Sequence, residues 1–185
     1  MSTSDTASDN DHTTSEAEVI GPVVSSAHLA SGAIPALSEI EFAVTMMVNA
    51  YHRWMVRCMA AAGAPGMSPL DTLVLHSVNH RGRPKTLADI CLVLNIEDTH
   101  TVTYSLKKLE KSGLVSTGKR GKEKSVSITP EGERICMEYR RLREALLVRP
   151  VKGLGMDERE LSRLAATLRS VSGHYDQAAR AAAAM

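Results

Sequence analysis

The chain has 185 residues, of which 43% are hydrophobic and 23% charged, enough for one ordinary core plus an interface. No apolar stretch is long enough to cross a bilayer, and no cationic start leads into an apolar run. We therefore expect neither a membrane-spanning protein nor one that bears a signal peptide, and we expect a cytoplasmic protein.

Charge is unevenly distributed, although the formal net charge is only +1. Residues 1–36 carry five acids and no Lys or Arg, which leaves 22 cations against 16 of the 21 acids in the remainder. Because this segment is also rich in Ser, Thr, Asp and Asn, it is predicted to be a disordered acidic arm. It serves either as a solubilising tail or as a competitor for a basic face of the body.

Residues 37–66 are predicted to form an N-terminal helix for the core or for dimerisation. The helix, from about Leu37 to Ala62, is apolar almost all round, so more than one of its sides must be covered. Tyr51, Trp54 and Met55 lie on it and are candidates for a small-molecule effector pocket, since such sites are mostly apolar. The alternative is plain core and dimer interface.

Two short helices are predicted next. Ser68-Pro69-Leu70-Asp71 opens the first with a serine cap, a proline in the first turn and an acid three residues past the cap. Residues 81–84, Arg-Gly-Arg-Pro, end it. Thr86-Leu87-Ala88-Asp89 then repeats the cap-plus-acid pattern. Two helices joined to a third by few residues are typical of a helix-turn-helix.

The third helix, ending at Ser112-Gly113, carries the candidate base- and phosphate-contacting residues. Val102, Leu106 and Leu109 fall within one narrow arc, so the opposite arc faces outward. Short polar residues near its start suit contacts with base edges, and lysines near its end suit phosphates. The candidates are Thr99, His100, Thr101, Thr103 and Tyr104, followed by Lys107, Lys108 and Lys111.

A basic β-hairpin is predicted to follow. Residues 114–117 and 124–128 have the alternating, β-branched character of paired strands. The six residues from Gly118 to Glu123 are predicted to form the turn, with both glycines allowing a tight reversal. Four cations there are candidates for phosphate contacts: Lys119, Arg120, Lys122 and Lys124.

Residues 131–185 are predicted to be C-terminal helices for dimerisation. In the helix that starts at Thr129-Pro130, we expect Ile135, Tyr139, Leu142 and Leu146 to face inward. The last helix begins at an Asp157 cap. Its apolar residues recur at a coiled-coil-like spacing that predicts an interface seam, made by Leu161, Leu164, Leu168, Val171 and Tyr175. A monomeric helical cap is the alternative.

From about Ser38 to Ala178 the chain resembles the MarR family of winged helix-turn-helix transcription regulators. Five segments carry the resemblance: 67–70 (Met-Ser-Pro-Leu), 86–90 (Thr-Leu-Ala-Asp-Ile), 101–104 (Thr-Val-Thr-Tyr), 108–115 (Lys-Leu-Glu-Lys-Ser-Gly-Leu-Val) and 127–132 (Ser-Ile-Thr-Pro-Glu-Gly). The resemblance implies a mainly α fold with a small β-hairpin wing. Residues 67–130 would be the DNA-binding domain of a homodimer that binds double-stranded DNA, and many such proteins respond to a small aromatic effector.

The chain departs from the family pattern at the wing and in the third helix. The Asp-x-Arg of the wing is replaced by Arg120 and Lys122, and Tyr104 stands where an arginine is usual. These departures favour one alternative, a dimeric winged-helix protein-interaction adaptor without DNA binding. They also leave the operator sequence open.

A metal- or redox-responsive sensor is a second alternative. His76 and His80 lie one helical turn apart, a spacing that can hold zinc, but no third ligand is evident. The three cysteines, Cys58, Cys91 and Cys136, are odd in number and lie within helical patterns, which is typical of buried reduced thiols. We find no phosphate-binding glycine loop or nucleophile elbow, and therefore expect no enzyme, cofactor or metal.

Overall fold

The computed structural model describes residues 21–121, 123–155 and 157–185, which divide into two compact units, one ending at Ala50 and the other beginning at Tyr51. The unit boundary falls within the long helix α1 (Pro35–Ala61). Residues 1–20 of the predicted arm lie outside the described residues. Its later part is not disordered throughout, because Ala27–Ser31 form the 3-10 helix η1 and α1 already begins at Pro35.

The first unit consists, where described, of η1 and the N-terminal part of α1. The Ser38 hydroxyl donates a hydrogen bond of 2.6 Å to the Leu29 carbonyl oxygen and so ties η1 to the helix. Met46 and Met47 are 58% and 69% exposed, and Val44 and Val48 are also exposed. This stretch therefore presents the surplus of apolar surface that the sequence predicted.

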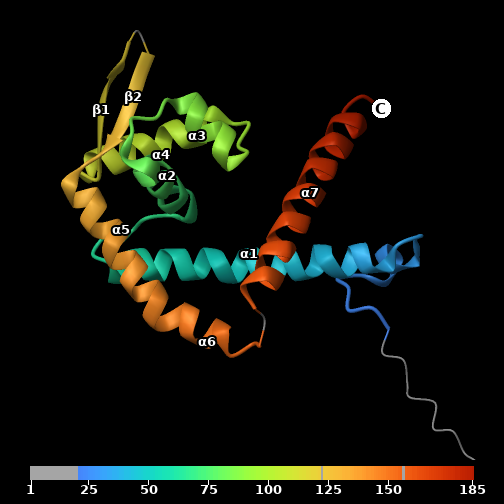
Figure 1. Ribbon diagram of the computed structural model, residues 1–185. Helices are drawn as coiled ribbons and strands as arrows, with labels where there is room; N and C mark the ends of the chain where they lie inside the picture. Colours follow the sequence, from blue (N-terminus) through green and yellow to red (C-terminus); the bar gives the residue numbers. More distant parts are fainter. Residues whose placement is uncertain (1–20, 122, 156) are drawn as a thin grey trace, which may run out of the picture. The chain divides into compact units, whose positions relative to one another are not determined.

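The second unit contains three short helices, and the starts of the first two were predicted correctly. Ser68 and Asp71 form a capping box at the start of α2 (Pro69–Asn79), and Thr86 and Asp89 form another at α3 (Leu87–Leu94). Between them lies the short 3-10 helix η2 (His80–Gly82). Here Arg81 and Gly82 take positive φ angles of 63° and 58°, which stops α2 from continuing. The third helix, α4 (Thr99–Lys111), follows after a short turn (Figure 1).

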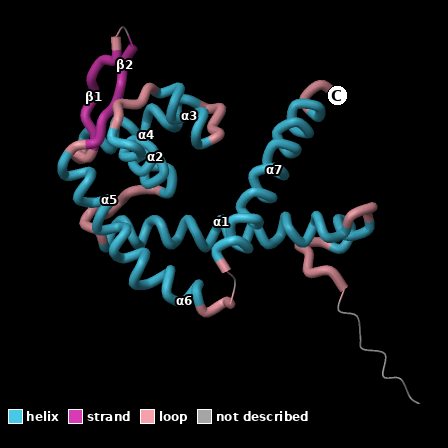
Figure 2. Tube along the Cα trace, viewed as in Figure 1, coloured by secondary structure: helices cyan, strands magenta, loops and turns pink. Residues whose placement is uncertain are grey.

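The wing is an antiparallel pair of strands, β1 (Val115–Arg120) and β2 (Glu123–Ile128), shown in magenta in Figure 2. The predicted turn of 118–123 was too long, because Gly118 pairs with Ser125 and the ladder continues to Arg120 and Glu123. Glycine weakens a strand but does not interrupt its backbone hydrogen bonds. Gly121, with φ of 65°, lies in the reversal between the two strands, and residue 122 lies outside the described residues.

The core of the second unit brings together all of these elements. Lys85 adds a backbone bridge to the wing, exchanging hydrogen bonds of 2.9 and 2.8 Å with Val126. α5 (Pro130–Arg143) contributes Ile135, which is fully buried. Further fully buried side chains are Met59, Val74, Leu75, Ile90, Val102 and Leu109. The three helices and the wing are thus fixed to one another.

The C-terminal part runs through η3 (Glu144–Val148, π-helical) and α6 (Arg149–Lys152) to α7 (Glu158–Ala182). The predicted Asp157 cap is present and pairs with Glu160 in a capping box. Leu146 was predicted to face inward but is 62% exposed, because the π-helical turn after Arg143 changes the helical phase. The fold class is the predicted one, mainly α with a small β-hairpin.

Candidate nucleic-acid interface

The start of α4 is held by short side-chain contacts. The Asp98 carboxylate accepts a hydrogen bond of 2.9 Å from the His100 backbone N–H and so caps the helix. The Thr101 hydroxyl donates to the Asp98 carbonyl oxygen at 2.8 Å. At the other end, Gly113 takes a φ of 71° and terminates the helix as predicted. A well-capped helix of 13 residues is therefore presented as a rigid rod.

The two faces of α4 separate as the sequence predicted. Val102, Ser105 and Leu109 are buried. Tyr104, by contrast, is 72% exposed. The other exposed candidates on this helix are Thr99, His100, Thr101, Lys107 and Lys111. His100, Tyr104, Lys107 and Lys111 thus form one exposed row, with Thr99 and Thr101 beside its start. The imidazole and phenol groups come first along the helix and the ammonium groups last, an order that suits base contacts followed by phosphate contacts.

Thr103 and Lys108, also predicted as DNA contacts, are half-buried. The Thr103 hydroxyl donates to the Thr99 carbonyl oxygen at 2.8 Å, which leaves only its oxygen to accept a hydrogen bond. Lys108 differs more strongly from expectation. Its ammonium group forms an ion pair of 2.5 Å with Asp71 and donates to the Gly66 carbonyl oxygen at 2.8 Å.

Asp71 connects three segments of the domain. One carboxylate oxygen accepts from the Ser68 backbone N–H at 2.8 Å and from the Lys108 ammonium, and the other accepts from the Ser105 hydroxyl at 2.7 Å. Burial alone would raise the pKa of Asp71. The hydrogen bonds from Lys108, Ser68 and Ser105 outweigh burial and hold this pKa below its ordinary value. The carboxylate is therefore charged and fully engaged at neutral pH.

An open hollow of about 470 Å³ lies beside this cluster. Leu70 of α2 lines one side, and His100, Tyr104 and Lys108 of α4 line the other. The hollow is therefore part of the same exposed surface as the predicted base-contacting residues.

The wing adds cations next to α4. Lys119 and Lys124 are directly opposed in the strand ladder, so both side chains lie on one face of the hairpin, and both are exposed. Like charges placed side by side favour an anionic partner. Lys122 and the side chain of Arg120 lie outside the described part. The Glu110 carboxylate accepts from the Thr117 backbone N–H at 3.2 Å, which ties α4 to the wing.

The three candidate effector residues differ in their exposure and contacts. Tyr51 is 42% exposed, whereas Met55 is fully buried. Trp54 packs edge-on against Tyr139, with ring centroids 6.3 Å apart. These contacts favour a packing role for Trp54 and Met55 and leave Tyr51 as the accessible member.

His76 and His80, the candidate metal pair, have separate environments. His76 packs edge-on against Tyr139 at 4.7 Å, and burial lowers its pKa below the ordinary value. His80 is exposed and ends α2. Among the described residues, no group of three or more His, Cys, Asp or Glu side chains is arranged to hold a metal ion.

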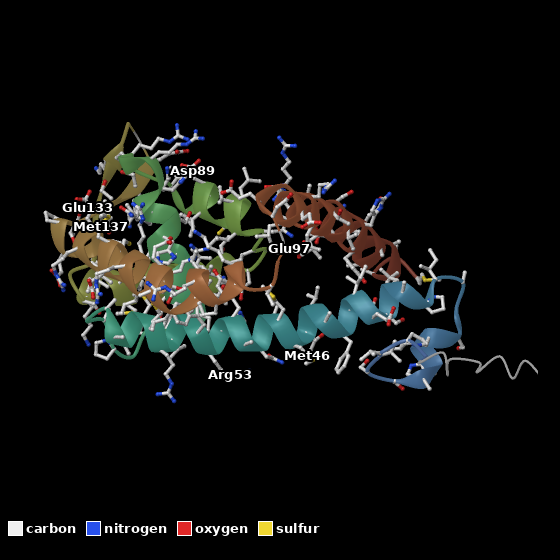
Figure 3. All side chains as sticks on the ribbon, turned by 60° about the horizontal axis from the view of Figure 1, so that its bottom comes forward. Met46, Arg53, Asp89, Glu97, Glu133 and Met137 are labelled. Carbon is white, nitrogen blue, oxygen red and sulfur yellow. The ribbon has the colours of Figure 1, made fainter. Side chains whose placement is uncertain are left out.

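All three cysteines are free and buried, as predicted. Burial, with a smaller contribution from the charge of Glu138, raises the pKa of Cys58 to about 11. Burial and the charge of Glu133 raise the pKa of Cys136 to about 11 as well. The acidic residue Glu133 lies on the exposed side of α5, as does Met137 (Figure 3). Protonated, covered thiols are poor nucleophiles.

A comparison with protein families finds a match to the winged helix DNA-binding domain over residues 67–132. Residues 67–132 therefore have the fold of a winged helix domain. The match nearly coincides with the segment 67–130 predicted for DNA binding. Comparison of the sequence with curated proteins found no match.

Solved structures place the winged helix domain in the fold of the MarR family. A mutant of MarR from E. coli, complexed with operator DNA, is similar with a TM-score of 0.60 at 18% identity, covering 76% of this chain and 99% of that one. A MarR family regulator from a Rhodococcus species has a TM-score of 0.59 at 16% identity, with 72% and 91% covered. The resemblance predicted from the sequence is therefore confirmed at the level of the fold.

CouR from Rhodococcus jostii, bound to p-coumaroyl-CoA, is also similar, with a TM-score of 0.58 at 14% identity over 71% of this chain and 90% of that one. Within the described part of this chain, every helix is too short or too polar to span a membrane.

Sequence reasoning missed the buried polar contacts that orient α4 in the winged helix domain. Asp71 was recognised only as a cap acid, and Ser105 was not singled out. Ser105 lies between Val102 and Leu109 on the buried arc, where a hydroxyl needs a partner. That position was the available signal, but the sequence alone does not say which residue is the partner.

Proposed function

We propose that the protein is a cytoplasmic transcription regulator that binds specific sequences in double-stranded DNA as a homodimer. The observation that carries the proposal is the exposed row of α4 residues, polar at the helix start and cationic at its end, next to the paired lysines of the wing. A helix with this arrangement fits the major groove, and a basic hairpin fits the neighbouring backbone. The E. coli MarR mutant with the same fold is complexed with operator DNA.

The residues divide into two roles in this proposal. Thr99, His100, Thr101, Thr103 and Tyr104 face base edges, because they occupy the first half of α4. The cations contact phosphates, and they are Lys107 and Lys111 of α4 with Lys119, Arg120, Lys122 and Lys124 of the wing. The exposure of Tyr104 supports its role in base recognition.

Dimerisation is proposed to use residues 37–66 and 131–185. On α7, Leu161, Leu164 and Leu168 are 38%, 48% and 38% exposed, and Tyr175 is 44% exposed. Val171 of the same seam is half-buried. So many apolar side chains on one helix in a single chain favour an interface with a second copy.

Control by a small aromatic effector is the finer part of the proposal. The similar CouR structure is bound to p-coumaroyl-CoA, and here Tyr51 and Trp54 offer aromatic surface next to Tyr139. Because Trp54 is the single tryptophan, a ligand reaching it would change the intrinsic fluorescence. Titration with aromatic carboxylic acids tests this, and an unchanged spectrum together with unchanged DNA affinity contradicts it.

The main proposal is tested by selecting bound fragments from a random pool of duplex DNA. We expect enrichment of one pseudo-palindromic sequence, with two half-sites about one helical turn apart. Affinity for it should fall steeply with salt, by a log-log slope of about −0.9 per phosphate contact. A pool that stays random would favour the protein-interaction adaptor instead.

A further inference from the structure

We infer that Asp71, Ser105 and Lys108 form a positioning unit that sets the orientation of the DNA-reading helix, and that Lys108 acts on sequence discrimination through this unit rather than by neutralising a phosphate. The inference rests on the proposed function. It assigns a role to Asp71 and Ser105, which lie off the exposed reading surface. It also gives Lys108 a positioning role in place of the predicted phosphate contact.

The first step is the burial of the charged centre. Asp71 is only 1% exposed, and a buried carboxylate is unfavourable unless hydrogen bonds satisfy it. Both of its oxygens are occupied, by Ser68, Ser105 and Lys108. Two of these three donors belong to the side chains of α4. α4 therefore supplies the hydrogen bonds to the Asp71 carboxylate that the start of α2 does not provide.

The second step is geometry. Ser105 and Lys108 are three residues apart, so they lie on neighbouring turns of one side of α4. Lys108 also reaches back to the Gly66 carbonyl oxygen at 2.8 Å, ahead of the α2 cap. Three directional contacts at two levels along the axis restrict both rotation and sliding of α4 on α2. Apolar packing of Val102 and Leu109 alone tolerates small shifts more readily, because it is not directional.

The third step is the consequence for the reading face. Tyr104 precedes Ser105 and is 72% exposed, and Lys107 precedes Lys108 and is exposed. Ser105 and Lys108, the two members of the unit on α4, are thus each adjacent in sequence to a residue of the exposed row. A rotation of α4 that broke the contacts to Asp71 would move His100 and Tyr104 relative to the bases. Misplaced side chains lose base discrimination before they lose general attraction to DNA.

The ammonium group of Lys108 is also poorly placed as a phosphate ligand. Two of its three N–H donors are already used by Asp71 and Gly66. Its charge is opposed by the Asp71 carboxylate at 2.5 Å, so the pair presents little net charge to DNA. Lys107, one residue earlier, is exposed. Among the described residues, no hydrogen bond or ion pair engages its ammonium group, so its charge can act on a phosphate.

The test compares Lys108→Met with the matched control Lys107→Met, using wild-type protein as reference. Affinities for the selected DNA and for a scrambled duplex are measured across salt concentrations, at a temperature where circular dichroism shows every variant folded. Lys107→Met should weaken binding to both duplexes alike and lower the salt slope by about 0.9. Lys108→Met should leave the slope unchanged and reduce the ratio of the two affinities by about tenfold, as expected for one lost base contact.

Ser105→Ala provides a second variant if Lys108→Met fails to fold. It removes one hydrogen bond to Asp71 and leaves the capping box and the ion pair in place, so discrimination should fall in the same direction by a smaller factor. A Lys108→Met protein that lowers the salt slope and preserves the affinity ratio, as Lys107→Met should, would overturn the inference. So would a Ser105→Ala protein with unchanged discrimination.

Amide hydrogen exchange separates failure of this inference from failure of the proposed function. Exchange in residues 99–111 should accelerate in Lys108→Met and Ser105→Ala but not in Lys107→Met, whether or not DNA is bound. If wild-type protein discriminates no DNA sequence, the proposed function fails while this exchange pattern still supports the positioning unit. If exchange is unchanged in both variants, the positioning unit is refuted even when wild-type protein discriminates between the two duplexes.

Discussion

Gly132, at the junction between the wing and α5, should be among the least replaceable residues of the domain. It is buried in the first turn of α5, and its backbone N–H donates to the Thr129 hydroxyl at 3.0 Å. A Cβ atom placed on it would lie 2.6 Å from Cδ1 and 3.1 Å from Cγ1 of Ile128, and would overlap the Leu114 carbonyl oxygen. That oxygen also accepts the backbone hydrogen bond from Thr129, at 3.2 Å, that joins β2 to the segment before the wing.

The magnitude follows from what would have to move. The Ile128 side chain can rotate away, but the Leu114 carbonyl belongs to backbone that is already hydrogen-bonded. Gly132→Ala should therefore destabilise the fold by about 3 kcal/mol, at the upper end of the usual cost of overpacking. For a chain of this length, that corresponds to a decrease in Tm of about 6–12 °C.

Calorimetry or thermal circular dichroism measures the effect, with Gly173→Ala as the matched control. Gly173 lies within α7, and a Cβ there would meet nothing within 4 Å. Because alanine favours helix, this control should gain up to about 1 kcal/mol. A Gly132→Ala protein as stable as wild type would refute the close approach of α5 to Leu114 and the arrangement of the wing that depends on it.

Three further predictions concern the half-buried His76, the thiols and α7. Burial lowers the folded-state pKa of His76 below the unfolded value of about 6.5, so the stability that His76 contributes is fully present above pH 6.5 and is lost as pH falls toward the lower folded pKa. His76→Phe should flatten this part of the profile of unfolding free energy against pH, measured with urea. A profile identical to that of wild-type protein contradicts the prediction. Cys58 and Cys136, with pKa values raised to about 11, should react with a thiol reagent at pH 7.5 only on unfolding, and rapid labelling of folded protein would instead support a redox sensor. Leu164→Asp combined with Leu168→Asp should convert a dimer to monomer or insoluble protein in light scattering, because unpaired charge in an apolar interface costs several kcal/mol. A soluble dimeric double variant would exclude this seam as the interface.

Much of the fold could be predicted because its signals are local. The capping boxes at Ser68, Thr86 and Asp157 depend on residues only three apart, and all three are present. The separation of α4 into a buried and an exposed face follows from helical periodicity alone, and Tyr104 and Val102 lie on the predicted sides.

What could not be predicted depends on partners distant in sequence or on changes of helical phase. Lys108 lies 37 residues from Asp71, so its position on the flank of α4 gave no indication of the ion pair. Leu146 follows a π-helical turn, which a constant period of 3.6 residues does not anticipate. Gly118 appeared to begin the turn of the wing, but backbone pairing with Ser125 keeps it in the strand.

The most direct test of sequence-specific DNA binding through α4 is a comparison of Tyr104→Ala with wild-type protein on selected and scrambled duplexes at one salt concentration. Tyr104 is 72% exposed and lies clear of the buried arc, so its replacement should leave Tm nearly unchanged. We expect discrimination between the two duplexes to fall by about 1–3 kcal/mol, with affinity for the scrambled duplex preserved. Equal losses on both duplexes, or no loss on either, would show that this face of α4 does not read the sequence.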